Sequence, residues 1–351
     1  MPLAPGEVIT VFGSFQGWNA SDPAYALQML DERQFFSELT FPEGSELRFR
    51  FAKGDASKVE KGPENREIPE HVHLVEGDAT LSFVLARWDD QPREGASIRG
   101  DVRRTEVAEI ANGRGIWIYL PPQYDEQPTR RFPVLYMLDG QNLFDASTSF
   151  AGEWRVDETV ETLIASGDIE PLIVVGFENA GGRRVFEYTP SRDEVFGGEA
   201  GSGGGEEHVK LIRQQVMPFI ESRYRVSTDP AETGFGGSSL GGLMSLYVAL
   251  NHADRFRRIA AVSPSVWWDD RDIVARILQA DRPPVRVWTD MGTQESAGAI
   301  EDFRVLVSAL RDKGFVDGPD FEAREVQGAR HNESAWSARL PDILRFLFPK
   351  G

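Results

Sequence analysis

The chain has 351 residues, of which 40% are hydrophobic and 11% aromatic, so it can bury a sizeable core and is not globally disordered. Its net charge of −18 and the lack of basic clusters argue against a nucleic-acid partner, because phosphate binding needs grouped Lys and Arg. The chain contains no cysteine, which excludes disulfides, thiolate metal ligands and a cysteine nucleophile. No stretch approaches the ~20 apolar residues that cross a bilayer, and the first residues lack the pattern of a secretory signal. We therefore expect a cytoplasmic protein without a membrane partner.

Short β-rich runs separated by Gly, Pro, Asn and Asp fill the first part of the chain. These runs are Glu7–Phe12, Phe35–Phe41, Glu46–Ala52 and Thr80–Leu85. In the third run, Leu47, Phe49 and Phe51 alternate with arginines, which is typical of a strand with one solvent-exposed face. The pattern predicts an all-β domain over residues 1–88, followed by a polar linker over residues 89–105.

The segment Val11–Asn19, Val-Phe-Gly-Ser-Phe-Gln-Gly-Trp-Asn, resembles the start of starch-binding and glycogen-binding modules. The resemblance implies a small immunoglobulin-like β-sandwich of the carbohydrate-binding-module type. In such modules the tryptophan of this motif is generally part of the core, so we favour a packing role for Trp18 over sugar binding. His71 and His73 lie near one another but lack a third ligand, and we expect no metal site here.

From residue 106 to residue 351 the pattern changes to alternating strands and helices. The expected strands are 115–120, 133–138, 172–177, 232–235, 258–263, 285–290 and 321–326. The expected helices are 155–165, 206–223, 240–251, 300–313 and 336–346. This alternation predicts an α/β domain with a mostly parallel sheet, whose active site lies beyond the carboxyl ends of the strands.

The segment Gly237-Ser-Ser-Leu-Gly241 is a G-x-S-x-G motif between an apolar run and a helical pattern. In that context the motif predicts a nucleophile elbow, the sharp turn that exposes a serine hydroxyl at the top of a parallel sheet. The turn needs glycine two residues before and two residues after the nucleophile, because side chains there would collide. Ser239 meets this condition and Ser238 does not, so we predict that Ser239 is the nucleophile.

A serine nucleophile needs a base, and His331 is the favoured candidate among the five histidines of the chain. It lies in the loop between the last expected strand and the last expected helix. His208 falls at the start of a charged helix and His252 at a helix end, where both are typical of solvated surface.

The base needs an orienting acid, and the loop after the strand at residues 285–290 supplies Glu295. Asp290, nearer the strand end, and Asp302 stay open as alternatives. The chain order Ser239, Glu295, His331 is the order found in α/β-hydrolases.

Two backbone N–H groups are expected to stabilise the oxyanion. The first belongs to Leu240, which follows the nucleophile at the start of a helix. The second is expected from the loop after the strand at 133–138, where Asp139-Gly140 permits a turn and Gln141 follows.

Several segments together resemble the esterase D-type family of α/β-hydrolases, which includes enterobactin esterases and feruloyl esterases. These segments are Tyr136–Phe144, Gly236–Gly242, Val262–Trp268 and Gly292–Glu295, followed by the late His331. The resemblance spans residues 106–349 and implies that Glu295 is the triad acid and that Gln141 donates to the oxyanion. A β-sandwich before such a domain resembles the arrangement in enterobactin-type esterases.

The sequence therefore predicts a serine carboxylic ester hydrolase that works through an acyl-enzyme, without a metal or other cofactor. The expected substrate is a small-molecule or glycan ester, either an acylated-sugar or feruloyl ester or a siderophore-type lactone. Candidate substrate-binding residues near the active-site loops are Trp154, Arg184, Trp267 and Trp268. An acyltransferase on the same fold and a non-catalytic carbohydrate-binding protein are the alternatives, and the oligomeric state stays open.

Overall fold

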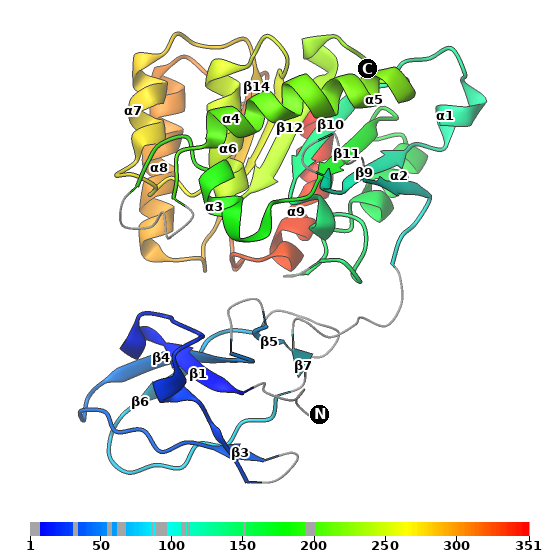
Figure 1. Cartoon of the computed structure of the whole chain (residues 1–351). Coiled ribbons are helices and arrows are strands. Elements are labelled where there is room, and N and C mark those ends of the chain that lie inside the picture. The colour runs from blue at the N-terminus through cyan, green and yellow to red at the C-terminus, as the bar shows by residue number, and fades with distance from the viewer. Residues whose placement is uncertain are drawn as a thin grey trace. The chain divides into compact units, whose positions relative to one another are not determined.

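A computed structural model describes residues 8–30, 34–54, 58–61, 68–85, 87–88, 97–106, 110, 113–149, 152–193 and 201–350 (Figure 1). The chain divides into two compact units. The first comprises Met1–Ala96 and Phe150–Gly152, and the second comprises Ser97–Ser149 and Glu153–Gly351. The boundary falls inside the predicted linker, whose residues 89–96 lie outside the described residues.

The first unit is built from short antiparallel strands around a small apolar core. Its main sheet has the order β1-β4-β6, formed by Thr10–Gly13, Glu46–Ala52 and His71–Leu74. Two further pairs join β2 (Gln28–Met29) to β3 (Phe35–Phe36) and β5 (Glu60–Lys61) to β7 (Arg87–Trp88). Leu47, Phe49 and Phe51 of β4 are buried, as their alternation with arginines predicts.

Two expectations for this unit need correction or refinement. Residues 80–85 form no strand, although their composition favours one, because apolar alternation alone does not provide a strand partner. Trp18, for which the sequence favours packing, has 39% of its surface exposed and meets Phe12 edge-on, with 6.0 Å between the ring centroids.

The second unit contains an eight-stranded sheet with the order β15-β14-β13-β12-β10-β11-β9-β8. The strands are β8 Asp101–Thr105, β9 Ile116–Leu120, β10 Val134–Leu138, β11 Ile173–Phe177, β12 Thr233–Ser238, β13 Arg258–Val262, β14 Arg286–Gly292 and β15 Phe321–Val326. The pairs from β11 to β15 are parallel, whereas β9 is antiparallel to both β11 and β8. The predicted mostly parallel sheet is confirmed.

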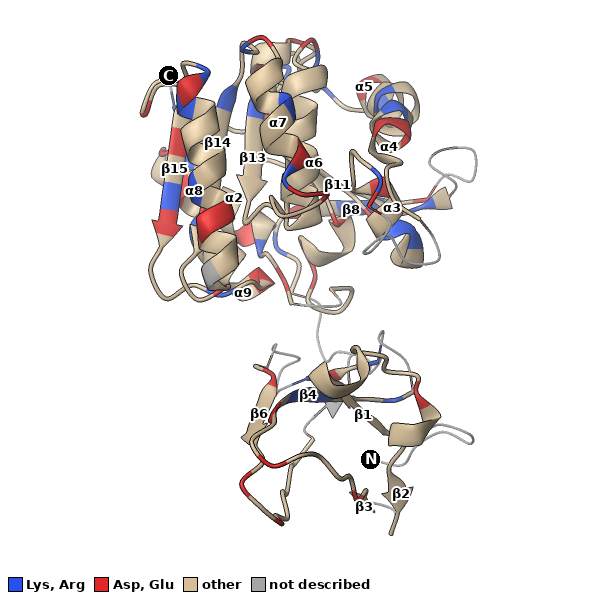
Figure 2. Cartoon of the chain, turned by 90° about the vertical axis from the view of Figure 1, so that its left-hand side faces the viewer, with Lys and Arg blue, Asp and Glu red and all other residues tan. Residues whose placement is uncertain are grey.

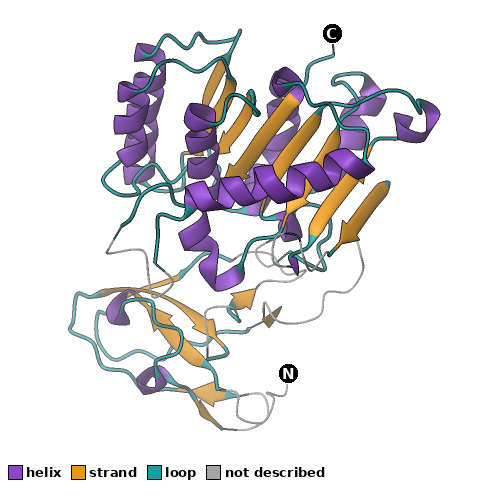
Figure 3. Ribbon diagram, turned by 45° about the horizontal axis from the view of Figure 1, so that its top comes forward, coloured by secondary structure: helices purple, strands orange, loops and turns teal. Residues whose placement is uncertain are grey.

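Helices cover both faces of this sheet (Figure 3). They are α1 Gln123–Glu126, α2 Val156–Ser166, α3 Arg184–Glu187, α4 Gly205–Leu211, α5 Met217–Arg223, α6 Leu240–Asn251, α7 Asp272–Gln279, α8 Ala297–Asp312 and α9 Glu333–Leu347. Helices α4 to α8 share one core cluster with one set of alternating strand residues, and α2 and α9 share another cluster with the opposite set. No helix among the described residues is long and apolar enough to cross a membrane.

Several elements differ from the sequence-based prediction, among them the short helices α1 and α3, which were not expected. Strand β8 occupies the end of the predicted linker. Its charged sequence, Asp-Val-Arg-Arg-Thr, suits an edge strand, but it lacks the alternation of apolar residues by which a strand is predicted. Helix α7 was not predicted, because its apolar residues follow a run of aspartates and arginines. The expected helix at residues 206–223 contains a π-helical turn at Ile212–Val216 between α4 and α5.

Charge on the second unit is mixed in sign. Figure 2 shows acidic and basic residues alternating along β15, the strand at the other edge of the sheet. Such charges discourage edge-to-edge association of sheets.

Candidate active site

Ser239 lies at the turn between β12 and α6, in a backbone conformation that is rare for a side-chain-bearing residue. Its φ is 60° and its ψ is −121°, which costs of order 1–3 kcal/mol and persists only when the surroundings enforce it. Two hydrogen bonds supply that enforcement: Ser239 N–H donates to Val262 O (3.0 Å), and Ser265 N–H donates to Ser239 O (3.1 Å). The turn therefore presents the hydroxyl beyond the carboxyl end of the sheet.

Glycines allow this turn because the backbone segments come close together. A Cβ on Gly237 would lie 3.1 Å from the Cα of Gly241, which is tighter than ordinary contact. A Cβ on Gly242 would lie 2.7 Å from Val262 O, so this glycine lets α6 start directly against β13.

A cleft of about 390 Å³ opens next to Ser239. Its lining residues are Ser239, Ser263, Pro264, Ser265, Trp267, Met291, Glu295, Ser296, Gly298, Ala299, Asp302 and His331. Ser239 is half-buried there, and its Oγ lies 3.3 Å from the Oγ of Ser265. The three predicted triad residues thus border the same cleft, from the loops after β12, β14 and β15.

His331 and Glu295 are hydrogen-bonded, with 2.7 Å between Nδ1 and Oε2. When Nδ1 donates its proton to the carboxylate, Nε2 is left with the lone pair that a base needs. The imidazole also meets the ring of Trp336 edge-on, with 5.0 Å between the centroids. Among the described residues no hydrogen bond joins His331 to Ser239, and catalytic hydrogen bonds of this kind often tighten only around a substrate.

The environment of Glu295 keeps its carboxylate ionised. Burial disfavours the charge, but hydrogen bonds from His331, from the Ser263 hydroxyl (2.6 Å) and from Gly292 N–H (2.8 Å) outweigh it. The pKa of Glu295 is therefore lowered. The carboxylate is almost fully buried while the imidazole stays accessible from the cleft, with side-chain exposures of 3% and 42%.

The two alternative acids have other partners. Asp290 is fully buried, forms an ion pair with Arg339 and accepts a hydrogen bond from Trp288 Nε1 (2.7 Å). Burial raises the pKa of Asp290, although Arg339 and Trp288 oppose that shift. Asp302 pairs with Arg271 at 2.6 Å. Neither aspartate is bonded to His331.

Two residues that hold Glu295 in place were not predicted from the sequence. Ser263, buried with a φ of 41°, donates to Glu295 and accepts hydrogen bonds from Trp336 Nε1 and Arg339 Nη1, both at 3.0 Å. Arg339 lies on α9 and has only 5% of its surface exposed. Its Nη2 is 3.5 Å from Glu295 Oε1. The only sequence signal for them is the Val-Ser-Pro-Ser segment after β13 and an arginine on an otherwise apolar helix face.

The two expected oxyanion donors lie at neighbouring strand ends. Strands β10 and β12 are parallel partners, with Met137 opposite Gly236, so the loops that follow them share one edge of the sheet. Leu240 is the first residue of α6, where backbone N–H groups have no partner within the helix. Gln141 lies in the 3-10 helix Gly140–Asn142, directly after β10.

Arg184 contacts this second loop rather than the lining of the cleft. Its Nε and Nη2 donate to the two oxygens of Asp139, both at 2.8 Å, and the Asn179 amide adds a bond of 2.6 Å. Asp139 itself has a φ of 56°, and its N–H donates to the hydroxyl of Tyr188 (3.1 Å). These bonds fix the turn that presents Gln141.

The four candidate substrate-binding residues have different positions. Trp267 is 42% exposed and lines the cleft. Trp154 and Trp268 are buried in the core, at 3% and 2% exposure, so we assign them to packing instead. The sequence could not separate them because all three tryptophans adjoin active-site loops. Arg184 is held by Asp139, as described above.

The expectation that His208 and His252 are surface residues is wrong, since their exposures are 2% and 5%. His252 Nε2 lies 2.9 Å from a carboxylate oxygen of Glu206. Burial, together with the nearby Arg114 charge, lowers the pKa of His208 to about 3, so that imidazole is neutral. Neither histidine lines the cleft.

Comparison with known proteins places this chain in a family. Residues 108–347 match the family model described as "Putative esterase". The uncharacterized protein YbbA of Bacillus subtilis is 26% identical over 254 residues, covering 68% of this chain and 94% of YbbA. The iron(III) enterobactin esterase of Dickeya dadantii is 25% identical over 269 residues, covering 72% of this chain but only 57% of that enzyme.

Among solved structures, the enterobactin esterase of Shigella flexneri matches with a TM-score of 0.60 at 15% identity. The match covers 97% of this chain and 87% of that chain, and it supports the α/β-hydrolase-type fold. Because the family model matches well over half of the sequence, the chain belongs to this family of esterases and is a carboxylic ester hydrolase.

Proposed function

We propose that the protein hydrolyses its ester through an acyl-enzyme formed on Ser239, with His331 as base and Glu295 as the orienting acid. The observation that carries the proposal is the 2.7 Å bond between His331 and the buried Glu295, on a cleft that Ser239 also lines. The strained turn at Ser239 supports it further, since such strain gathers at functional sites.

The proposed reaction has two halves. Ser239 Oγ attacks the ester carbonyl while His331 Nε2 takes its proton, and the N–H groups of Leu240 and Gln141 stabilise the oxyanion. The bond to the alcohol then breaks, and His331 returns the proton to the departing oxygen. Water attacks the acyl-enzyme with His331 again as base, which releases the acid and restores Ser239.

We further propose that the substrate is an uncharged ester carrying an aromatic ring. Trp267 offers an exposed ring at the cleft, beside the apolar side chains of Pro264 and Met291. Among the described residues that line the cleft, none is Lys or Arg, so nothing there would neutralise an anionic ligand. A feruloyl-type ester fits these features first. A siderophore-type lactone is the second candidate, supported by the name of the Dickeya relative, an iron(III) enterobactin esterase.

Replacing Trp267 by alanine tests the aromatic contact. We expect kcat/KM for methyl ferulate to fall about 10-fold, since stacking and burial of an aromatic ring are worth roughly 1–1.5 kcal/mol here. Hydrolysis of ethyl acetate, which has no ring, should change less than about 2-fold. Equal losses on both esters would argue against Trp267 as a recognition residue.

Replacing Arg184 separates a positioning role from substrate binding. Arg184→Ala should lower kcat about 10- to 100-fold with KM nearly unchanged, because the Gln141 turn loses its brace and one oxyanion donor is worth about 10²–10³ in kcat. The exposed neighbour Arg183 provides the control variant Arg183→Ala. A large rise in KM with kcat retained would instead indicate that Arg184 binds the substrate.

We also propose that the unit starting at Ser97 is sufficient for the chemistry, because it contains the triad, both oxyanion donors and edge strand β8. A truncated chain of residues 97–351 should keep most of its p-nitrophenyl acetate hydrolysis, because a small ester needs only these groups. A folded fragment that is inactive on p-nitrophenyl acetate would show that the first unit contributes to the catalytic site.

A further inference from the structure

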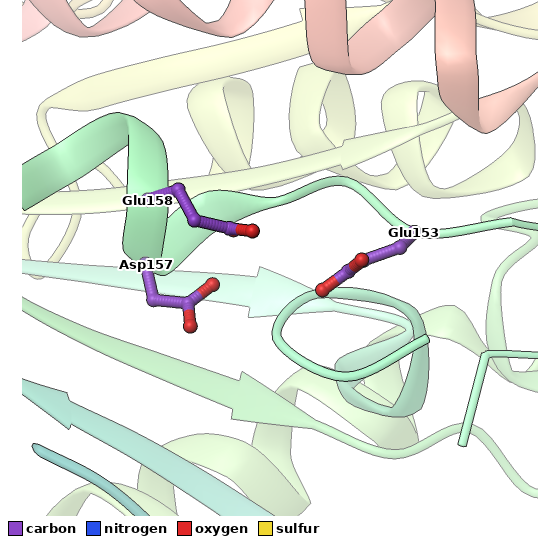
Figure 4. Close-up of side chains that lie close together, drawn as sticks. All are labelled: Glu153, Asp157 and Glu158. Carbon is purple, nitrogen blue, oxygen red and sulfur yellow. The ribbon is translucent and has the colours of Figure 1, made fainter. Parts of the chain in front are cut away.

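Three carboxylates converge beside the start of α2, in a cluster that the ester chemistry does not use. Asp157 and Glu158 belong to the first turn of the helix, and Glu153 belongs to the segment before it. One oxygen of each lies within 4.8 Å of the others. Figure 4 shows the three carboxylates directed toward the space between them.

Two of these carboxylates carry a buried oxygen that has no hydrogen-bond partner among the described residues. Asp157 is fully buried; its Oδ2 accepts from Arg99 N–H (2.6 Å), but its Oδ1 has no donor. Glu158 Oε1 pairs with Arg155 (3.2 Å), whereas its Oε2 is buried without a donor. A buried carboxylate oxygen left in this way is costly, so a proton or a cation is expected to occupy the gap.

The chemistry of the cluster favours a hard divalent cation. All donors are carboxylate oxygens, and one guanidinium offsets only one of three negative charges. Oxygens bound to calcium at 2.3–2.6 Å are at most about 5 Å apart, which matches the observed spread. Magnesium demands shorter distances and near-ideal octahedral geometry, which three carboxylates from one helix turn and its lead-in segment suit less well.

We propose that Glu153, Asp157 and Glu158 form a calcium site that fastens the entry of the second unit to α2. The entry segment already meets the cluster: Ser97 Oγ donates to Glu153 Oε1 (2.7 Å) and accepts from Ala146 N–H (2.8 Å). With the Arg99 bond to Asp157, the lead-in to β8, the loop after β10 and the helix start meet at one point. The bound ion links these three segments and stabilises the fold, independently of the ester chemistry.

The test is thermal unfolding of the full chain, stripped with EDTA and then supplied with CaCl₂ or MgCl₂ at pH 7.5. A site that binds only the folded state should raise Tm by about 5 °C at a calcium concentration near 100 times Kd, and less with magnesium. Titration calorimetry of the unmodified protein should show one calcium bound. Asp157→Asn and Glu153→Gln should each abolish the shift, while Glu161→Gln, on the same helix but outside the cluster, should keep it.

In EDTA, Asp157→Asn should be at least as stable as the parent, because it removes one of three clustered carboxyl groups and keeps the shape of the side chain. This comparison separates loss of calcium binding from a folding defect. The proposal is overturned if calcium neither raises Tm nor gives a heat of binding in calorimetry. It is also overturned if calcium raises the Tm of Asp157→Asn as much as that of the parent. Burial raises the pKa of Asp157 to about 8, with Glu158 adding to the shift and Arg99 N–H opposing it. Stability that falls as pH rises toward about 8 and then levels off, with no response to calcium, would identify a proton as the occupant.

Discussion

Ser239→Ala should lower kcat for p-nitrophenyl acetate by about 10⁴-fold or more, with the protein still folded. In the proposed mechanism no acyl-enzyme can form without this hydroxyl, because His331 and the oxyanion donors then have no nucleophile to assist. The comparison is made by steady-state kinetics, with circular dichroism and Tm measured on the same samples.

Ser238→Ala is the matched control, since it removes the same atom from the adjacent residue. Ser238 is the last residue of β12, is 4% exposed, and does not line the cleft. This variant should keep most of the activity. If Ser238→Ala were inactive and Ser239→Ala active, the assignment of the elbow would have to be reversed.

Glu295→Gln should lower kcat by about 10³- to 10⁴-fold. The amide can donate to Nδ1 of His331, which favours the tautomer with its proton on Nε2 and leaves no base toward Ser239. The amide also cannot stabilise the imidazolium that forms during attack. The kinetics are measured on p-nitrophenyl acetate, with KM expected to change little.

Asp302→Asn is the control for that variant, because Asp302 borders the same cleft but pairs with Arg271. It should retain activity within a few-fold. Strong loss in Asp302→Asn with Glu295→Gln largely active would instead identify Asp302, on α8, as the acid.

Much of the second unit could be predicted from the sequence because buried parallel strands read as short apolar runs. The runs that became β10, β11 and β13 are bounded by glycine, proline or polar residues, and their predicted ends agree with the structure within about two residues. Strand β8 was not predicted because an edge strand needs few apolar residues and so lacks the apolar pattern of a buried strand. Residues 80–85 have strand-like composition without a pairing partner, which no local pattern reveals.

The residues proposed for catalysis could be placed on particular loops because the fold fixes where the strands end. What the sequence could not supply is the direction of each side chain. Trp267 and Trp268 are adjacent, yet one faces the cleft and the other packs inside. Arg184 could be read as a ligand for substrate because its partner, Asp139, is 45 residues away in the chain.

The contacts that hold Glu295 in place also join segments that are distant in the sequence. Ser263 and Arg339 meet it only after β13, β14 and α9 have packed together. A short motif marks Ser239 as the candidate nucleophile because its constraint is local. The position of Glu295 and its support are set by tertiary packing, so a single sequence leaves several aspartates and glutamates as candidates for the acid.

The most direct test of the proposed acyl-enzyme mechanism is labelling with a fluorophosphonate, followed by peptide mass spectrometry. The reagent reacts with a serine that a neighbouring base activates, and it leaves a stable phosphonyl adduct. We predict a single adduct, located on Ser239 by fragmentation of the labelled peptide, that forms at least about 100-fold more slowly in His331→Ala. An adduct on Ser238 or on any other residue, or unimpaired labelling in His331→Ala, would contradict it.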